Sequence, residues 1–278
     1  MPIKAIIIDD ERLARNELKK LLSQHTEIEI IEEASNVDEG VEKIELNRPD
    51  LIFLDINMPK LNGIEFLKKV QPKQLIVIAN YGENYEVLSR TIKGIIAQNY
   101  PRELLYLAIS IEERKAKKDD DYAKRGEYLK RDFGDFFEDR LMFFVHPDGI
   151  EGEAIGAAAN RTWGTKNAIA TLEKKGEDIN HFLVTAPDGD ISFHKEYFAA
   201  LTYKWLKAEK RNQKYYQTAL YTFNNNYWDV PLFIRILSIS LTIPILASSI
   251  MEKNRRETFS CYTLNLGLMK KVNYWDTS

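Results

Sequence analysis

The sequence predicts an α/β fold, with a doubly wound unit of five βα repeats over residues 1–118 and a mixed α+β second domain after it. Two patterns predict the first unit. Short runs of branched apolar residues without polar alternation, such as 5–8 and 51–54, are typical of strands buried on both faces. Between these runs, apolar residues recur at helical spacing. Strands and helices that alternate in this way predict a parallel sheet.

The predicted elements follow one another closely along the first unit. Strands are expected at 5–8, 28–31, 51–54, 75–78 and 94–97. Helices are expected to begin at Glu11, to cover 37–44, 63–70 and 87–92, and to begin again at Pro101. The inner face of the first helix would contain Ala14, Leu18, Leu21 and Leu22, and Asn36 can cap the second helix.

Length and composition set the broad class. The 278 residues are enough for two domains, and a hydrophobic content of 44% excludes wholesale disorder. With 39 basic and 42 acidic side chains, the charge alone does not indicate nucleic-acid binding. Cys261 is the single cysteine, so an intramolecular disulfide is excluded and a reducing compartment is expected. The apolar run near the N-terminus is too short for a signal peptide, and we expect the protein in the cytoplasm.

Three carboxylates are the first candidate site. Asp9, Asp10 and Asp55 follow predicted strands, at the sheet edge where functional groups of such folds gather. Two unit charges about 5 Å apart repel by roughly 3 kcal/mol at an effective dielectric near 20, so the cluster calls for a cation. Oxygen ligands with waters in an octahedron suit Mg²⁺. Each aspartate taken alone could instead cap a helix or open a loop.

These motifs resemble the receiver domain of two-component response regulators, and the stretch 12–15 is similar to its LytTR-type subgroup. The residues that carry the resemblance, which covers 3–118, are Ile6-Ile7-Ile8-Asp9-Asp10-Glu11 and Asp55-Ile56-Asn57-Met58-Pro59-Lys60-Leu61-Asn62-Gly63. The resemblance implies a flavodoxin-like fold and Asp55 as phosphoacceptor. It also implies Mg²⁺ held by Asp9, Asp10, Asp55 and the Asn57 carbonyl, a sensor histidine kinase as partner, and pairing of two receivers as a homodimer.

The sequence departs from this family at the positions that read out phosphorylation. A Ser or Thr is expected after the fourth strand, where Ile78 or Ala79 stands. A Lys is expected before Pro101, where this chain has Tyr100, and a phenol cannot replace an ammonium group. The sequence therefore retains the metal and acceptor residues and lacks the switch residues.

The second half matches no motif that we can name. Residues 119–139 are predicted to be a charged linker, and 140–278 an output or interaction domain. A hairpin is expected from 181–185 and 191–194, followed by a helix with Tyr197, Leu201, Trp205 and Ala208 on one face. Apolar residues alternate with Ser, Thr and Pro over 237–245. This alternation favours a half-buried strand over a membrane helix, and no membrane partner is expected.

One basic segment is a nucleic-acid candidate, formed by Lys204, Lys207, Lys210, Arg211 and Lys214. A solvated helix face is the alternative.

Two functional hypotheses follow from the whole sequence. The first is a response regulator whose degenerate receiver controls a second domain that binds duplex DNA and regulates transcription. The second is a signalling adaptor that binds a protein partner and whose second domain does not bind DNA. No constellation of residues supports an enzyme.

Overall fold

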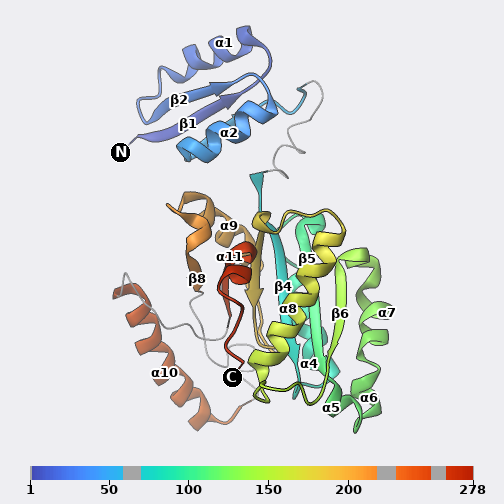
Figure 1. The fold of residues 1–278 in the computed structure, drawn as a ribbon. Helices are drawn as coiled ribbons and strands as arrows, with labels where there is room; N and C mark the ends of the chain where they lie inside the picture. The colour runs from blue at the N-terminus through green and yellow to red at the C-terminus, as the bar shows by residue number, and fades with distance from the viewer. Residues whose placement is uncertain (1, 59–69, 218–229, 252–260, 278) are drawn as a thin grey trace. The chain divides into compact units, whose positions relative to one another are not determined.

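The computed structural model describes residues 2–58, 70–217, 230–251 and 261–277 (Figure 1). The chain forms two compact units. The first consists of Met1–Pro72 with Thr202–Arg211, and the second of Lys73–Leu201 with Asn212–Ser278. The sequence predicted a boundary at residue 118, and the structure divides the chain at Pro72 instead. Each unit is described by itself.

The first unit contains a three-stranded parallel sheet in the order β2-β1-β3. Its elements are β1 (Ile3–Ile8), α1 (Arg12–Leu22), β2 (Ile28–Ala34), α2 (Val37–Asn47) and β3 (Leu51–Leu54). The Asn36 side chain accepts a hydrogen bond from the Glu39 N–H at 3.0 Å, which confirms the predicted cap of α2. Val37 and Ile44 of α2 pack against Ile6 and Ile8 of β1. The predicted helix at 63–70 lies almost entirely outside the described residues.

The helix α1 differs from its prediction. None of its residues is buried, and the Leu21 side chain, expected on the inner face, is 57% exposed. The predicted fourth and fifth strands would have widened this sheet and supplied cover for its faces. Because the segments predicted to form them belong to the second unit, α1 packs on a narrower sheet.

The second unit contains a six-stranded sheet in the order β6-β5-β4-β7-β9-β8. All its strands are parallel to one another except β9, which is antiparallel to both of its neighbours. From residue 73 onward the elements are β4 (Lys73–Asn80), α4 (Tyr85–Ile96), β5 (Leu105–Glu112), α5 (Glu113–Ala116), α6 (Asp120–Ala123), α7 (Arg125–Phe137), β6 (Leu141–His146), α8 (Ala157–Lys174), β7 (Phe182–Ala186), α9 (Tyr197–Lys207), β8 (Tyr215–Gln217), α10 (Leu232–Met251), β9 (Tyr262–Asn265) and α11 (Leu266–Lys271).

The α/β class and the mixed second sheet are confirmed, but the single five-stranded sheet is wrong. The segment predicted as a fifth strand is the end of α4, and the helix predicted from Pro101 is replaced by β5. β5 lies between β4 and β6 in the sheet and is contacted by α7 and α8, and every one of its residues is buried. In a segment buried on both faces, helical and extended patterns of apolar residues look alike.

Residues 119–139, predicted to be a charged linker, fold into α6 and α7. Tyr122 of α6 is fully buried, and Leu129, Phe133 and Phe137 of α7 face the interior of the unit. Most of the charges that suggested a linker are exposed, whereas Arg125 is buried and donates to the Glu83 carbonyl at 2.7 Å. A segment with this much buried apolar surface is part of a domain.

Two further elements of the second half differ from prediction. Residues 182–186 form β7, but its partner strands are β4 and β9, and 191–194 form no strand, so the predicted hairpin is absent. Residues 232–251 form α10, a helix that continues through Pro244, where a strand was predicted. Among the described residues, no helix combines the length and the apolar character that crossing a membrane requires. The predicted helix α9 is confirmed, with Leu201 and Trp205 buried.

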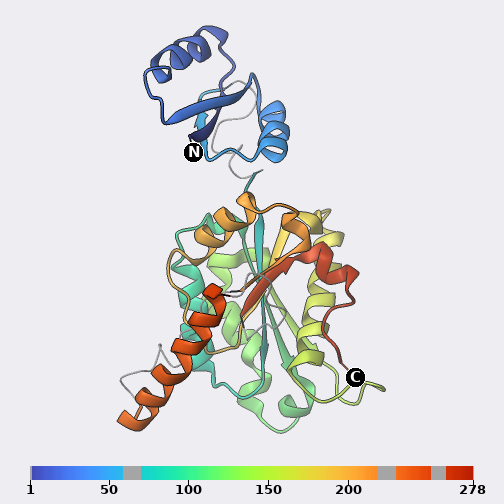
Figure 2. The same cartoon turned by 90° about the vertical axis from the view of Figure 1, so that its left-hand side faces the viewer.

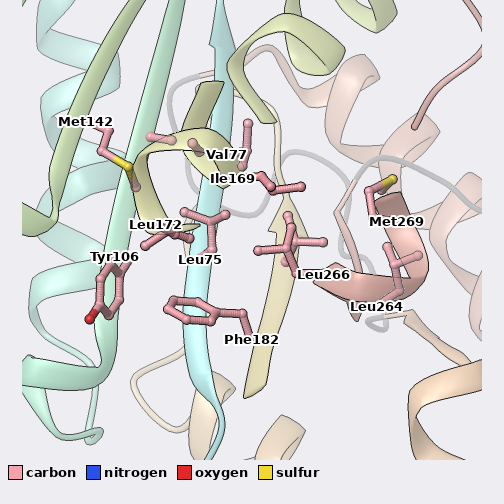
Figure 3. Packing of buried hydrophobic residues seen from close by; sticks show 13 residues of the cluster. Leu75, Val77, Tyr106, Met142, Ile169, Leu172, Phe182, Leu264, Leu266 and Met269 are labelled. Carbon is pink, nitrogen blue, oxygen red and sulfur yellow. The ribbon is translucent and has the colours of Figure 1, made fainter. Parts of the chain in front are cut away.

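The main core lies between α8 and the second sheet. Figure 3 shows Ile169 and Leu172 of α8 close to Leu75 of β4, with Phe182 of β7 below them. The Tyr106 and Phe182 rings meet edge to face, with their centroids 5.0 Å apart. These contacts join strands from residues 73–112 to strands formed after residue 180, so both parts of the chain share one core.

Candidate metal centre

Three aspartates of the first unit converge at the carboxyl ends of its strands. Each of Asp9, Asp10 and Asp55 offers one carboxylate oxygen, and these oxygens lie within 4.8 Å of one another. Asp9 and Asp55 are half-buried, whereas Asp10 is exposed. The structure therefore brings together the three residues that the sequence selected as metal ligands.

The local backbone explains why these side chains meet. The Asp55 N–H donates to the Ile8 carbonyl at 2.9 Å, and the Asp9 N–H donates to the Ala34 carbonyl at 3.1 Å. These bonds continue the pairing of β1 with β3 and of β1 with β2 past the ends of the strands, so the loops that follow β1 and β3 begin at the same edge of the sheet. Each carboxylate also accepts a bond from the backbone two residues ahead, Asp9 from the Glu11 N–H at 2.7 Å and Asp55 from the Asn57 N–H at 3.0 Å. These short turns fix the direction of both side chains.

The donor set fits a hard divalent cation. The three carboxylates supply oxygen ligands, and among the described residues no ion pair to a basic side chain neutralises any of them. The nearby Arg15 guanidinium donates to the Asp9 carbonyl at 2.7 Å and pairs with Glu33, so its charge is shared with another acid. Asn57 is exposed at the start of the following loop, next to the cluster in sequence. Oxygen-rich sites of this composition suit Mg²⁺.

The positions expected to read out phosphorylation belong to the other unit. Ile78 and Ala79 lie in β4, and Tyr100 precedes β5. In the second sheet β4 pairs with β5 and β7, so neither position extends the sheet that holds Asp55. The departure from the family pattern is therefore structural as well as chemical.

The five basic candidates for nucleic acid are divided by their contacts. Lys207 forms an ion pair with Asp50. The Arg211 guanidinium pairs with Glu45 at 3.2 Å and stacks 3.9 Å from the centre of the Trp205 ring. These two side chains therefore hold Thr202–Arg211 within the first unit. The other three, Lys204, Lys210 and Lys214, are exposed.

Sequence reasoning missed a second polar edge, at the point where β4 and β7 separate in the second sheet. The Asn80 side chain donates to Glu83 at 2.8 Å, and Arg161 pairs with Asp188 at 2.5 Å. Burial, with the nearby charges of Asp188 and Glu83, raises the pKa of Asp190. The order of the strands would have indicated this edge, because functional polar groups gather where the chain segments that follow two adjacent strands run to opposite sides of the sheet. That order becomes visible only in the folded chain.

Comparison with known proteins identifies the domain type of the N-terminal part of the chain. The sequence profile of the response regulator receiver domain matches residues 5–99. These residues have a receiver sequence. The match does not end at Pro72, the last residue before the second unit. It continues through β4 and α4, which belong to the second unit.

The receiver has many relatives among curated proteins. An uncharacterized response regulatory protein of Vibrio cholerae is 48% identical over 73 residues, which are 26% of this chain and 31% of the relative. The chain thus spans about a third of that protein. The sensory transduction protein LytR of Staphylococcus epidermidis is 28% identical over 240 residues, 81% of this chain and 89% of the relative. The relatives are response regulators of the LytR and LytT type.

Among solved structures, a mannosyltransferase from Pyrobaculum calidifontis is similar over 75% of this chain and 48% of its own, with 13% identity and a TM-score of 0.45. At this TM-score the likeness assigns neither fold nor activity to the second unit. The second unit thus remains without a recognised family.

Proposed function

We propose that the receiver accepts a phosphoryl group on Asp55 in a reaction that depends on Mg²⁺, and that a sensor histidine kinase in the cytoplasm supplies the group. The observation that carries this proposal is the convergence of three carboxylate oxygens within 4.8 Å at the ends of β1 and β3. Asp9, Asp10, Asp55 and the Asn57 carbonyl would hold the ion.

The chemistry follows from the roles of these residues. An oxygen of the Asp55 carboxylate attacks phosphorus, the bond between phosphorus and the donor's leaving atom breaks, and an acyl phosphate forms on Asp55. Mg²⁺, when bound, offsets the charge on the transferring oxygens. The Asn57 N–H holds one Asp55 oxygen at 3.0 Å and so orients the carboxylate. Asp9, fixed by the Glu11 N–H, keeps a second carboxylate beside it.

Intact-mass measurement tests the phosphoacceptor. The full chain is incubated with acetyl phosphate, with and without MgCl₂. We expect the mass of one phosphoryl group to be added only with Mg²⁺, and to be lost with hydroxylamine, which cleaves acyl phosphates. Asp55→Asn should abolish the addition and Asp10→Asn should weaken its Mg²⁺ dependence, whereas Asp121→Asn, at an exposed carboxylate of the second unit, should change nothing. No added mass, or an equal mass in Asp55→Asn, would refute the proposal.

As the output of the chain we propose duplex DNA binding and transcription regulation as the first candidate. Exposed Lys204 and Lys210, in the segment Thr202–Arg211 of the first unit, and exposed Lys214 of the second unit support it, and so does the kinship of the receiver with regulators of transcription. The pairing of Lys207 and Arg211 with acids leaves fewer charges for phosphate than the sequence suggested. The adaptor reading is the alternative, favoured by the position of the expected switch residues in the other unit.

A salt titration separates the two outputs. If the lysines bind phosphates, random duplex DNA should bind at low salt and weaken steeply as salt rises. The double variant Lys204→Gln/Lys210→Gln should lower the salt slope by about two. A matched control is Lys118→Gln/Lys124→Gln, which removes two exposed charges elsewhere. Absence of binding at low salt would eliminate DNA as the partner and leave the adaptor reading.

A further inference from the structure

The helix α10 carries an apolar surface of unusual orientation. Its two most buried described side chains are polar, Ser238 at 3% and Thr242 at 4% exposure. Its large apolar side chains point outward instead, with exposed fractions between 42% and 73%, and they are Leu232, Phe233, Ile236, Leu237, Ile239, Leu241 and Ile243. A surface helix of a globular protein shows the opposite arrangement.

The width of this surface indicates what covers it. At 3.6 residues per turn, the seven exposed side chains span about 200° of the helix circumference. A helix from a second copy of the chain would cover only the narrower stripe of a helix–helix seam. An apolar medium that surrounds half of the helix covers the whole arc. In Figures 1 and 2, α10 lies at the margin of the second unit.

Polar groups near the arc are arranged for such a medium. The Ser240 hydroxyl, which lies within the arc, donates to the Ile236 carbonyl at 2.9 Å, so it enters an apolar layer already satisfied. Arg235 is the only charged residue of α10, and it lies at the edge of the arc. Its Nε donates to the Val230 carbonyl at 3.0 Å. A cation at this boundary complements the phosphate groups of lipid heads.

We propose that α10 binds a phospholipid surface, lying in the plane of the interface with its seven apolar side chains inserted. The exposed apolar side chains lie between Leu232 and Ile243 on one side of the helix, so this side can enter the boundary between lipid heads and acyl chains while Ser238 and Thr242 face the protein. This placement is compatible with the absence of a spanning helix among the described residues, and it differs from the sequence prediction that the chain has no membrane partner. The proposal does not depend on the function of the receiver.

Vesicle flotation tests this proposal with the full chain and vesicles of phosphatidylcholine, with and without phosphatidylglycerol. We expect the chain to float with both, and more strongly with the anionic lipid. Ile236→Asp and Ile243→Asp, made separately, should each lower the partition coefficient by about tenfold, because each puts a carboxylate into the apolar layer. The control is Ile155→Asp, at an isolated side chain of the second unit that is 77% exposed, and it should float like the unchanged chain.

A second measurement reports insertion directly. Phe233→Trp places a fluorophore in the arc, and its emission should shift to the blue when vesicles are added. Three results would overturn the proposal: no flotation of the unchanged chain, equal loss in Ile155→Asp, or a dimer in light scattering that Ile236→Asp dissociates while flotation persists. The last result would identify a second copy of the chain as the occupant.

Discussion

Replacing Tyr122 by Phe should destabilise the second unit by more than a hydroxyl group usually contributes. The Tyr122 ring is fully buried in α6, and its oxygen accepts a hydrogen bond from the Glu112 N–H at 3.0 Å. The same hydroxyl donates to the Asn80 carbonyl. It thus joins the ends of β4 and β5 to the segment that the sequence suggested was a linker.

The magnitude follows from the two main-chain groups that lose their partner. A buried polar group left without a hydrogen bond costs about 1–3 kcal/mol. Phe fills nearly the same volume, and the ring keeps its contact with the Lys115 ammonium, 4.6 Å from its centre, so packing changes little. With two such groups, we expect the free energy of unfolding of the second unit to fall by about 2–6 kcal/mol.

The assay is urea unfolding followed by tryptophan fluorescence, fitted with one transition for each unit because the two need not unfold together. The matched control is Tyr85→Phe, which removes an exposed hydrogen bond to Asp132 of 2.8 Å in the same unit. Its effect should stay within about 0.5 kcal/mol. If both variants lose the same free energy, Tyr122 does not join the strand ends and 119–139 is a linker after all.

Three further predictions concern other parts of the chain. The Ser35 N–H, which donates to the Glu39 carboxylate at 2.8 Å, lowers the pKa of Glu39 together with Lys43 and the Ser35 hydroxyl, from 4.5 to about 2. The contribution of Glu39 to stability is therefore full above pH 4.5 and is lost as the pH falls towards 2. When the free energy of unfolding of the first unit is measured with urea at a series of pH values, Glu39→Gln should reduce its fall between pH 4.5 and pH 2. Gly164→Ala should cost about 1–3 kcal/mol of unfolding free energy despite its better helix propensity, because the new Cβ would lie 2.9 Å from the Ser110 Cβ; a stabilised variant in urea would contradict the packing of α8 on β5. Burial raises the pKa of Cys261 to about 12, so a chromogenic disulfide reagent at neutral pH should react with it only after unfolding, and prompt reaction in the native protein would contradict its burial.

Local patterns in the sequence were sufficient for the aspartate site. Asp9, Asp10 and Asp55 each follow a short apolar strand within the first 55 residues, and parallel strands that are neighbours place their ends at one edge. The cap of α2 by Asn36 and the apolar face of α9 were also readable, because both depend on residues a few positions apart.

Only the tertiary structure decided which sheet each later strand joins. The apolar sequence of β4 is compatible with a strand at the edge of the first sheet and with a central strand of another sheet. In the structure β4 lies between β5 and β7, because α8 and residues after 180 bury its apolar side chains. The same applies to β5, whose apolar residues fit a helix or a buried strand equally well, and to α10, whose alternating residues predicted a strand. In each case the deciding contacts join residues far apart in the sequence, and a pattern of local hydrophobicity contains no information about those partners.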